Sequence, residues 1–229
     1  MKGMILNESE NIVSIATFKS MNDKTGDMVQ IWIMLKDVNP VEALKTGQDK
    51  AICFDCPHRQ GSCYVNVGQA PNQVWKTYKR GGYATLNLSK LKQVIKNKPV
   101  RFGAYGEPVL IPIDIVKFIA DNAKAYTGYT HQWHKVDFIE YKEYFMASCE
   151  SAYEVLNAHY TGWRTFRVAK TEESDIMDTS TEITCPNITH EVQCRDCTLC
   201  DGAKGAGKSI VVPVHGTKAK INAFNLKTI

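Results

Sequence analysis

The residues best suited to chemistry in this chain of 229 are its eight cysteines, seven of which fall near two short segments. The C-terminal segment reads Cys194-x2-Cys197-x2-Cys200, and Cys185 lies nine residues before Cys194. Zinc sites usually draw on two separated cysteine pairs, whereas a C-x2-C-x2-C run is typical of loops that wrap a [4Fe–4S] cube. Three thiolates of one loop reach three corners, and Cys185 is the candidate for the fourth. The spacing favours a [4Fe–4S] cluster, with structural zinc as the alternative.

The N-terminal segment, Cys53-x2-Cys56-x6-Cys63, has no fourth cysteine beside it. Two interpretations stay open. A zinc ion could complete its ligand set with His58 or Cys149. Alternatively, three thiolates hold a [4Fe–4S] cluster and leave one iron open for a small ligand, as catalytic zinc keeps an open position. Cys149 ends a predicted strand and is otherwise expected to be a small buried apolar side chain.

The elements that must position these cysteines alternate between strands and helices. Apolar β-forming runs between turn residues predict strands at 30–35, 99–104, 126–133, 145–149, 164–168, 182–185 and 209–214. Helical spacing and capping residues predict helices at 41–44, 72–79, 89–96, 113–123 and 152–159. The first 28 residues look polar and mixed, with a turn at 22–26, and 171–181 is expected to be a loop.

This alternation is typical of βαβ units and a parallel sheet. The predicted fold class is α/β, either open or closed into a (βα)n barrel or partial barrel of parallel strands, with a cysteine-rich C-terminal loop region. We expect residues 1–181 to form the core with the N-terminal cysteine loop. Residues 182–229 would add the C-terminal cysteines and the last strand to the same core.

Polar side chains recur where the predicted strands end. They are Glu107, His131, Ser148, Arg167 and His215. Parallel α/β folds carry their chemistry at the carboxyl ends of the strands, so these residues are candidates for one shared site.

Composition excludes several classes of protein. The net charge is +4, apolar residues make up 44% and charged residues 23%, which is ordinary for a globular protein and too weakly basic to argue for nucleic acid. We find no run of about 20 apolar residues that could span a membrane and no apolar signal-peptide core near Met1. A cytoplasmic location without a membrane partner is therefore expected. There, clustered cysteines are metal ligands more often than disulfides.

A strand, a three-cysteine loop and βα units with Gly106-Glu107-Pro108 after the next strand resemble the radical SAM superfamily over roughly residues 30–216. The resemblance implies a partial (βα)6 barrel, with Cys53, Cys56 and Cys63 binding a [4Fe–4S] cluster. It implies that Glu107 lies beside the methionine part of S-adenosylmethionine and that Ser148 contacts this cofactor. The C-terminal cysteines would hold an auxiliary cluster, and an external electron donor would be a partner.

The family's usual cysteine spacing is C-x3-C-x2-C, whereas this chain has C-x2-C-x6-C, and Tyr105 stands where the family's GGEP segment has its first glycine. His131 is expected to line the same pocket. The chain also resembles uncharacterised cysteine-rich bacteriophage proteins, which implies the cytoplasm of a bacterial host.

Two further patterns in the sequence suggest functions other than radical SAM chemistry, and the first of them is rejected. Residues 202–209 match the phosphate-loop pattern G-x-x-x-x-G-K-S, but a strand is predicted after them, where a phosphate loop opens a helix. We therefore expect a glycine-rich turn. Residues 76–101 are rich in Lys and Arg with Tyr78 and Tyr83 between them, which is typical of a solvated helix face but also suits single-stranded nucleic acid. The alternative function is thus a non-catalytic module with zinc or iron–sulfur sites, binding nucleic acid through 76–101.

Overall fold

In the computed structural model, residues 2–59, 61–170, 178–205 and 207–226 form two five-stranded sheets. The first sheet runs in the order β1 (Gly3–Glu8), β2 (Ile12–Thr17), β3 (Val29–Leu35), β4 (Pro99–Tyr105) and β5 (Ala125–Thr127). The pairs β3–β4 and β4–β5 are parallel. Every residue of β3 is buried, as in parallel strands covered on both faces. The strand predicted at 30–35 is thereby confirmed.

The first 28 residues correct the sequence analysis, because they contribute two strands. β1 and β2 form an antiparallel hairpin, and β2 also pairs antiparallel with β3. The sheet is therefore mixed and not wholly parallel as expected. Serines, asparagines and glutamates between the apolar residues of these short strands weaken the alternating pattern by which strands are recognised.

The second sheet is parallel throughout, in the order β6 (Tyr129–Thr130), β7 (Met146–Cys149), β8 (Thr165–Ala169), β10 (Ser209–Pro213) and β9 (Glu182–Thr184). One residue, Gly128, separates β5 of the first sheet from β6 of the second. The strand predicted at 126–133 is thus divided at Gly128 and ends at Thr130. The α/β class with parallel strands is confirmed.

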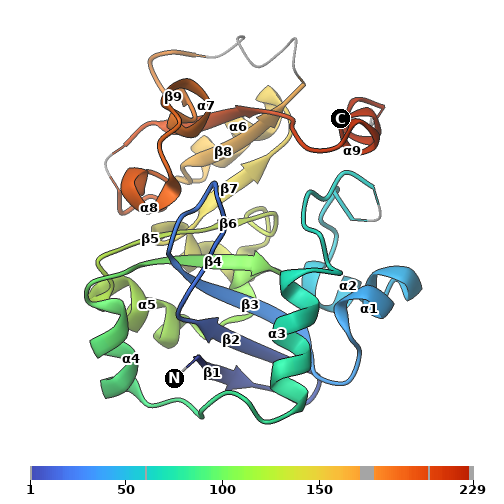
Figure 1. The fold of residues 1–229 in the computed structure, drawn as a ribbon. Helices are drawn as coiled ribbons and strands as arrows, with labels where there is room; N and C mark the ends of the chain where they lie inside the picture. Colours follow the sequence, from blue (N-terminus) through green and yellow to red (C-terminus); the bar gives the residue numbers. More distant parts are fainter. Residues whose placement is uncertain (1, 60, 171–177, 206, 227–229) are drawn as a thin grey trace.

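Five helices lie at the predicted places. They are α1 (Pro40–Thr46), α3 (Ala70–Lys79), α4 (Leu88–Ile95), α5 (Ile113–Asn122) and α6 (Ala152–Tyr160). The sequence analysis did not predict α2 (Lys50–Cys53), α7 (Pro186–His190), α8 (Cys194–Cys197), α9 (Lys218–Asn225) or the 3-10 helices η1 (Pro108–Leu110) and η2 (Val136–Glu143). The hydroxyl of Ser151 accepts from the backbone N–H of Glu154 and caps α6. Figure 1 shows α4 and α5 on one side of the strands and α1 and α2 on the other.

Aromatic side chains fill the core where the two sheets meet. The rings of Phe102 and Phe145 lie 5.2 Å apart, and Tyr141 stacks on Phe145 at 5.8 Å. Phe102 and Phe145 are fully buried. This packing fixes β4 against β7 and so fixes the ends from which the polar side chains emerge.

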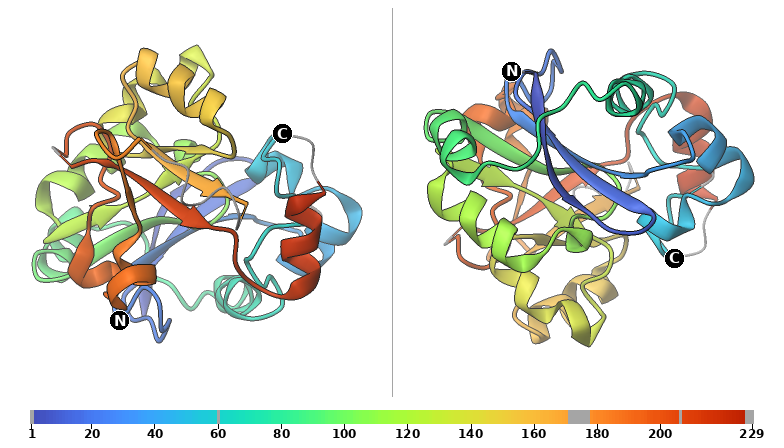
Figure 2. Two further views of the ribbon diagram at one scale, coloured as in Figure 1. Left: turned by 90° about the horizontal axis from the view of Figure 1, so that it is seen from above. Right: turned by 90° about the horizontal axis from the view of Figure 1, so that it is seen from below.

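The C-terminal part folds back over the rest of the chain. Figure 1 and the views along the vertical axis in Figure 2 place β9, α7 and α8 at one end of the molecule, with α9 beside the segment that follows α2. The ring of Phe224 in α9 stacks on His58 at 5.6 Å. None of the helices in the described ranges is long and apolar enough to cross a membrane.

Candidate functional site

One cavity of about 270 Å³ brings together the residues that the sequence singles out. Its lining includes Cys53, Cys56 and Cys63 (the N-terminal cysteine group) and Cys185, Cys194, Cys197 and Cys200 (the C-terminal cysteine group), together with Glu107, His131 and Ser148. Arg167 is buried but does not line it, whereas His215 does. Side chains from segments more than 100 positions apart in the sequence thus share one chamber.

Alternate residues of neighbouring strands form the wall of this cavity. On β4 they are Arg101, Gly103 and Tyr105; on β5 and β6, Thr127 and Tyr129; on β8, Phe166 and Val168; and on β10, Ile210 and Val212. Successive side chains of a strand point to opposite faces, so one face of both sheets is turned toward the same space.

The N-terminal cysteine group lies on α2 and the turns that follow it. The backbone N–H of Cys56 donates to the carbonyl of Cys53 at 3.0 Å, and that of Cys63 donates to the carbonyl of His58 at 2.8 Å. Arg59 donates from Nε and Nη2 to the two carboxylate oxygens of Asp49, at 2.9 and 2.7 Å. This bidentate pair ties the turns back onto the start of α2.

Burial and mutual repulsion govern the thiols of this group. Burial raises the pKa of Cys53, and the neighbouring Cys56, Glu107 and Cys63 raise it further. Burial likewise raises the pKa of Cys63, which Cys56 also raises. A metal that binds here must therefore displace protons, and its binding free energy must offset the repulsion between the thiolates.

Two carboxylates and two histidines form a network at the ends of β4, β6 and β7. Glu107, only 5% exposed, accepts from the hydroxyl of Thr130 at 2.6 Å and from Nδ1 of His131 at 3.2 Å. Glu150 Oε1 accepts from Nε2 of His131 and from Nε2 of His58, both at 3.0 Å. Nε2 of His131 also lies 3.9 Å from Sγ of Cys56.

Charge is concentrated in this network. Both ring nitrogens of His131 face carboxylate oxygens, an arrangement that favours the doubly protonated ring. Burial lowers the pKa of His131, but Cys56, Glu107 and Glu150 raise it well above its ordinary value. Burial raises the pKa of Glu150, but hydrogen bonds from His131 and His58 outweigh it and leave that pKa well below its ordinary value.

The same network supplies one candidate site for a single metal ion. The ligand atoms of His58, His131 and Glu150 all lie within 4.8 Å of one another. Among the described residues, which include all eight cysteines, no three thiols lie that close. The sequence analysis named His58 and His131 but missed Glu150. Glu150 directly follows the strand predicted at 145–149, and a polar residue at the end of a strand is the signal by which Glu107 and His131 were found.

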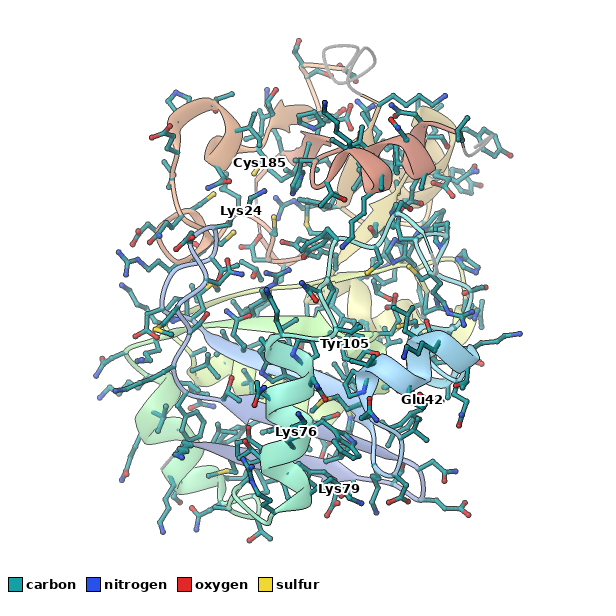
Figure 3. All side chains as sticks on the ribbon, turned by 45° about the vertical axis from the view of Figure 1, so that its right-hand side comes forward. Lys24, Glu42, Lys76, Lys79, Tyr105 and Cys185 are labelled. Atoms are coloured by element: carbon teal, nitrogen blue, oxygen red, sulfur yellow. The ribbon has the colours of Figure 1, made fainter. Side chains whose placement is uncertain are left out.

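The C-terminal cysteine group is held by backbone contacts. The N–H groups of Cys194 and Arg195 donate to the carbonyls of Lys24 and Thr25, at 3.1 and 3.0 Å, and the carbonyl of Cys200 accepts from Gly128 at 3.0 Å. Cys185 follows β9 directly. Figure 3 shows Cys185 and Lys24 close together in the upper part of the molecule, away from Tyr105.

The four thiols of this group influence one another. Burial raises the pKa of Cys200 well above its ordinary value, and Cys194, Cys185 and Cys197 raise it further. Burial also raises the pKa of Cys194, with Arg101 opposing and Cys185 and Cys197 adding to the increase. The thiols of this group therefore lie near enough to repel one another when they ionise.

Cys149 and Ser148 end the same strand but differ in role. Cys149 is fully buried, and its Sγ faces the carbonyl of Ala147 at 3.6 Å, away from the cavity lining. Ser148 lines the cavity, and its carbonyl accepts from Nε1 of Trp133 at 3.0 Å. The interpretation of Cys149 as a small buried apolar residue fits this position.

The glycine-rich segment is fixed by one arginine. The guanidinium of Arg164 donates to the carbonyls of Leu199, Gly202 and Lys208 and to the carboxylate of Asp201. Strand β10 begins at Ser209, so the segment leads into a strand as expected and not into a helix.

In comparisons with known proteins, no family model, no curated protein and no solved structure matches this chain.

Proposed function

We propose that this chain is an iron–sulfur protein resembling radical SAM enzymes, with one [4Fe–4S] cluster in each cysteine group. The observation that carries the proposal is that three cysteines from one segment and four from another line a single cavity together with Glu107, His131 and Ser148. Two sets of thiols facing a shared chamber are suited to metal chemistry next to a bound ligand.

The strand arrangement supports a partial barrel. Parallel strands are neighbours in each sheet, in the order β3, β4, β5 in the first and β6, β7, β8, β10 in the second. Gly128 joins β5 of the first sheet to β6 of the second. Alternate side chains of these strands face the cavity, as interior positions of a barrel do. The N-terminal cysteine group, Glu107 and His131 lie beyond the carboxyl ends, where such folds carry their chemistry.

The ligand sets fit two different clusters. Thiolates that bind separate irons of a cube lie farther apart than thiolates on one tetrahedral ion. Among the described residues no three thiols lie within 4.8 Å of one another, which argues against a preformed site for a single tetrahedral ion. Cys53, Cys56 and Cys63 would hold one cluster and leave an iron open. Cys185, Cys194, Cys197 and Cys200 would hold a closed one. When bound and reduced by an external donor, the cluster at Cys53, Cys56 and Cys63 would supply one-electron chemistry toward S-adenosylmethionine.

The chain's own residues bind and shield the cofactor. The carboxylate of Glu107 accepts hydrogen bonds and, in the resemblance, takes the amino group of S-adenosylmethionine, while His131 orients that carboxylate through Nδ1. Ser148 offers a hydroxyl at the end of β7. Phe166 on β8 and Ile210 on β10 line the cavity with apolar surface and exclude water from it.

The alternative function is a non-catalytic module that is stabilised by structural zinc ions or iron–sulfur clusters and binds nucleic acid through residues 76–101. Figure 3 shows Lys76 and Lys79 on α3, and neither residue is among those that line the cavity. Nζ of Lys79 pairs with Asp37 at 2.9 Å, which leaves less of this charge for phosphate. The cavity, and not α3, is where the unusual residues gather.

The test is made on protein purified without oxygen. We expect about eight irons and eight sulfides per chain, and a reduced-cluster EPR signal that changes when S-adenosylmethionine is added. The variants Cys56→Ser and Cys197→Ser should each lose one cluster, and only Cys56→Ser should lose the response to S-adenosylmethionine. About four irons without a response, or zinc without iron, would refute the proposal, and the zinc result would favour the binding module.

A further inference from the structure

Arg101 is a buried cation in the wall of the cavity, between the two cysteine groups. It lies in the middle of β4 and is 9% exposed. It lines the cavity in alternation with Gly103 and Tyr105. A charge in such a place is costly unless it is paired. Among the described residues the other buried arginine, Arg167, is paired with Glu182.

The hydrogen bonds of Arg101 leave most of its donors unused. A guanidinium has five N–H groups. Within the described residues, Arg101 makes one hydrogen bond, from Nη2 to the hydroxyl of Tyr64, has no carboxylate partner, and its Nε has no acceptor. Arg59 and Arg167, by contrast, each grip both oxygens of a carboxylate, on Asp49 and Glu182.

Other unsatisfied polar atoms surround the same space. The hydroxyls of Thr127 and Tyr105 are buried, line the cavity and have no hydrogen-bond partner in the described part of the chain. Native proteins rarely leave such groups unpaired, so several coinciding in one cavity indicate a missing ligand.

Aromatic rings line the cavity beside Arg101. Tyr129 lies against Phe166 with their ring centroids 4.4 Å apart, and Tyr64 lies near His215 at 6.1 Å. All four line the cavity. A planar ring of a ligand can stack on these faces while an anionic group reaches the guanidinium.

We propose that Arg101 is the counter-ion for the anionic group, a carboxylate or a phosphate, of a small ring-bearing substrate that binds between the two cysteine groups. Thr127 and Tyr105 supply further hydroxyls to the same ligand. The inference rests on the proposed function in one respect, because it calls the ligand a substrate. The competing role for Arg101 is to neutralise the thiolates of the C-terminal cysteine group, since Cys194 lies close enough to raise the pKa of Arg101.

The experiment measures binding of two matched pairs to the anaerobically purified full chain by calorimetry. The pairs are uridine 5′-monophosphate with uridine, and 4-hydroxyphenylacetate with 4-hydroxyphenylacetamide. We expect the charged member of at least one pair to bind at least about 10-fold more tightly than its neutral partner. The pair that shows this distinguishes a phosphate from a carboxylate.

The variant Arg101→Gln should weaken binding of that charged probe by about 10- to 100-fold and leave the neutral probe unchanged. Arg101→Lys, which keeps the charge with fewer donors, should fall between. Arg80→Gln removes the same charge from an exposed position on the C-terminal side of α3 and should change nothing.

Three results would overturn the inference: no charged probe binds, charged and neutral probes bind alike, or Arg101→Gln lowers the iron content without changing any affinity. Iron and sulfide are measured on the same samples. A chain without iron that binds an anion through Arg101 refutes the proposed function and keeps the anion site. A chain with about eight irons and no Arg101-dependent binding refutes the anion site and keeps the proposed function.

Discussion

The two cysteine groups face the same cavity but differ in their surroundings. The N-terminal cysteine group has three thiols beside a charged network of Glu107, His131 and Glu150. The C-terminal cysteine group has four thiols, fixed mostly through backbone carbonyls such as those of Lys24 and Thr25. Acid–base groups next to three thiols suit chemistry, whereas four thiols held by backbone suit a fixed centre. Under the proposed function, the first group would therefore be the reactive one and the second would have a structural or electron-storing role.

An arginine–carboxylate pair lies on the chain near each group, and the two pairs differ in exposure. Arg167 and Glu182 are both 5% exposed at their side chains, whereas Arg59 is 18% and Asp49 is 4% exposed. The pair beside the C-terminal cysteine group is the more buried, so breaking it should have the larger effect.

The largest expected effect comes from Glu182→Gln. Both oxygens of Glu182 accept from Arg167 at 3.0 Å, and the glutamine variant removes the negative charge that faces this buried guanidinium. We expect the free energy of unfolding, measured in urea, to fall by about 3–5 kcal/mol. Because β9 leads into Cys185, iron should be lost from the C-terminal cysteine group first. The exposed Glu140→Gln is the control, and equal stability of the two variants would contradict the prediction.

Asp49→Asn applies the same change to the N-terminal cysteine group. The pair with Arg59 is more exposed, so we expect a smaller loss, about 2 kcal/mol in the free energy of unfolding. Iron should now be lost from the N-terminal cysteine group, and the EPR response to S-adenosylmethionine should disappear. Equal iron loss from both groups in this variant would mean that the two sites are not independently supported.

Two glycines test the loops beside each group. Gly106 has φ +78°, and an added Cβ would lie 2.6 Å from the carbonyl oxygen of Ile33. Gly202 has φ +76°, and its Cβ would lie 2.6 Å from the carbonyl carbon of Tyr144. Alanine at either position should lower the free energy of unfolding by about 1–3 kcal/mol.

Gly81→Ala separates strain from crowding in that experiment. Gly81 has φ +69° but nothing within 4 Å of an added Cβ. Its alanine variant should lose only about 1 kcal/mol, from the left-handed backbone alone. If all three variants lose the same amount, close packing does not fix the loops at residues 106 and 202.

The smallest expected effect is a pH dependence near the C-terminal cysteine group. A hydrogen bond from Lys98 at 2.7 Å lowers the pKa of Asp27, against the opposing effect of burial. The folded pKa lies below the unfolded one, so this stabilisation is present at neutral pH and is lost as pH falls below about 4. The carboxylate is 44% exposed, so the contribution stays under about 1 kcal/mol. The slope of stability against pH between 5 and 3 should be smaller in Asp27→Asn, and an unchanged slope would contradict the assignment.

Much of this fold could be predicted from the sequence where long apolar runs end at turn residues. β3, β4 and α5 lie within a residue or two of their predicted positions for that reason. The hairpin of β1 and β2 was missed because polar residues interrupt it. The helices α7 and α8 have only five and four residues, too few to show a period.

The candidate site was predicted in its cysteines and in Glu107, because spacing and strand ends are visible in sequence. The contacts between its parts were not. His58 and Glu150 share a hydrogen bond across 92 positions of the chain, and only the folded backbone brings them together. The sequence analysis did not single out Arg101 for the same reason. Only the folded structure shows that this buried guanidinium has no carboxylate partner among the described residues.

The contact between residues 194–200 and the start of the sheet also bears on how the protein is made. Gln193 donates to the carbonyl of Asp23 across 170 positions, and Cys200 bonds Gly128 at the junction of the two sheets. Contacts so distant in sequence form late, after most of the chain has left the ribosome. The seven cavity cysteines are therefore brought together only late in folding.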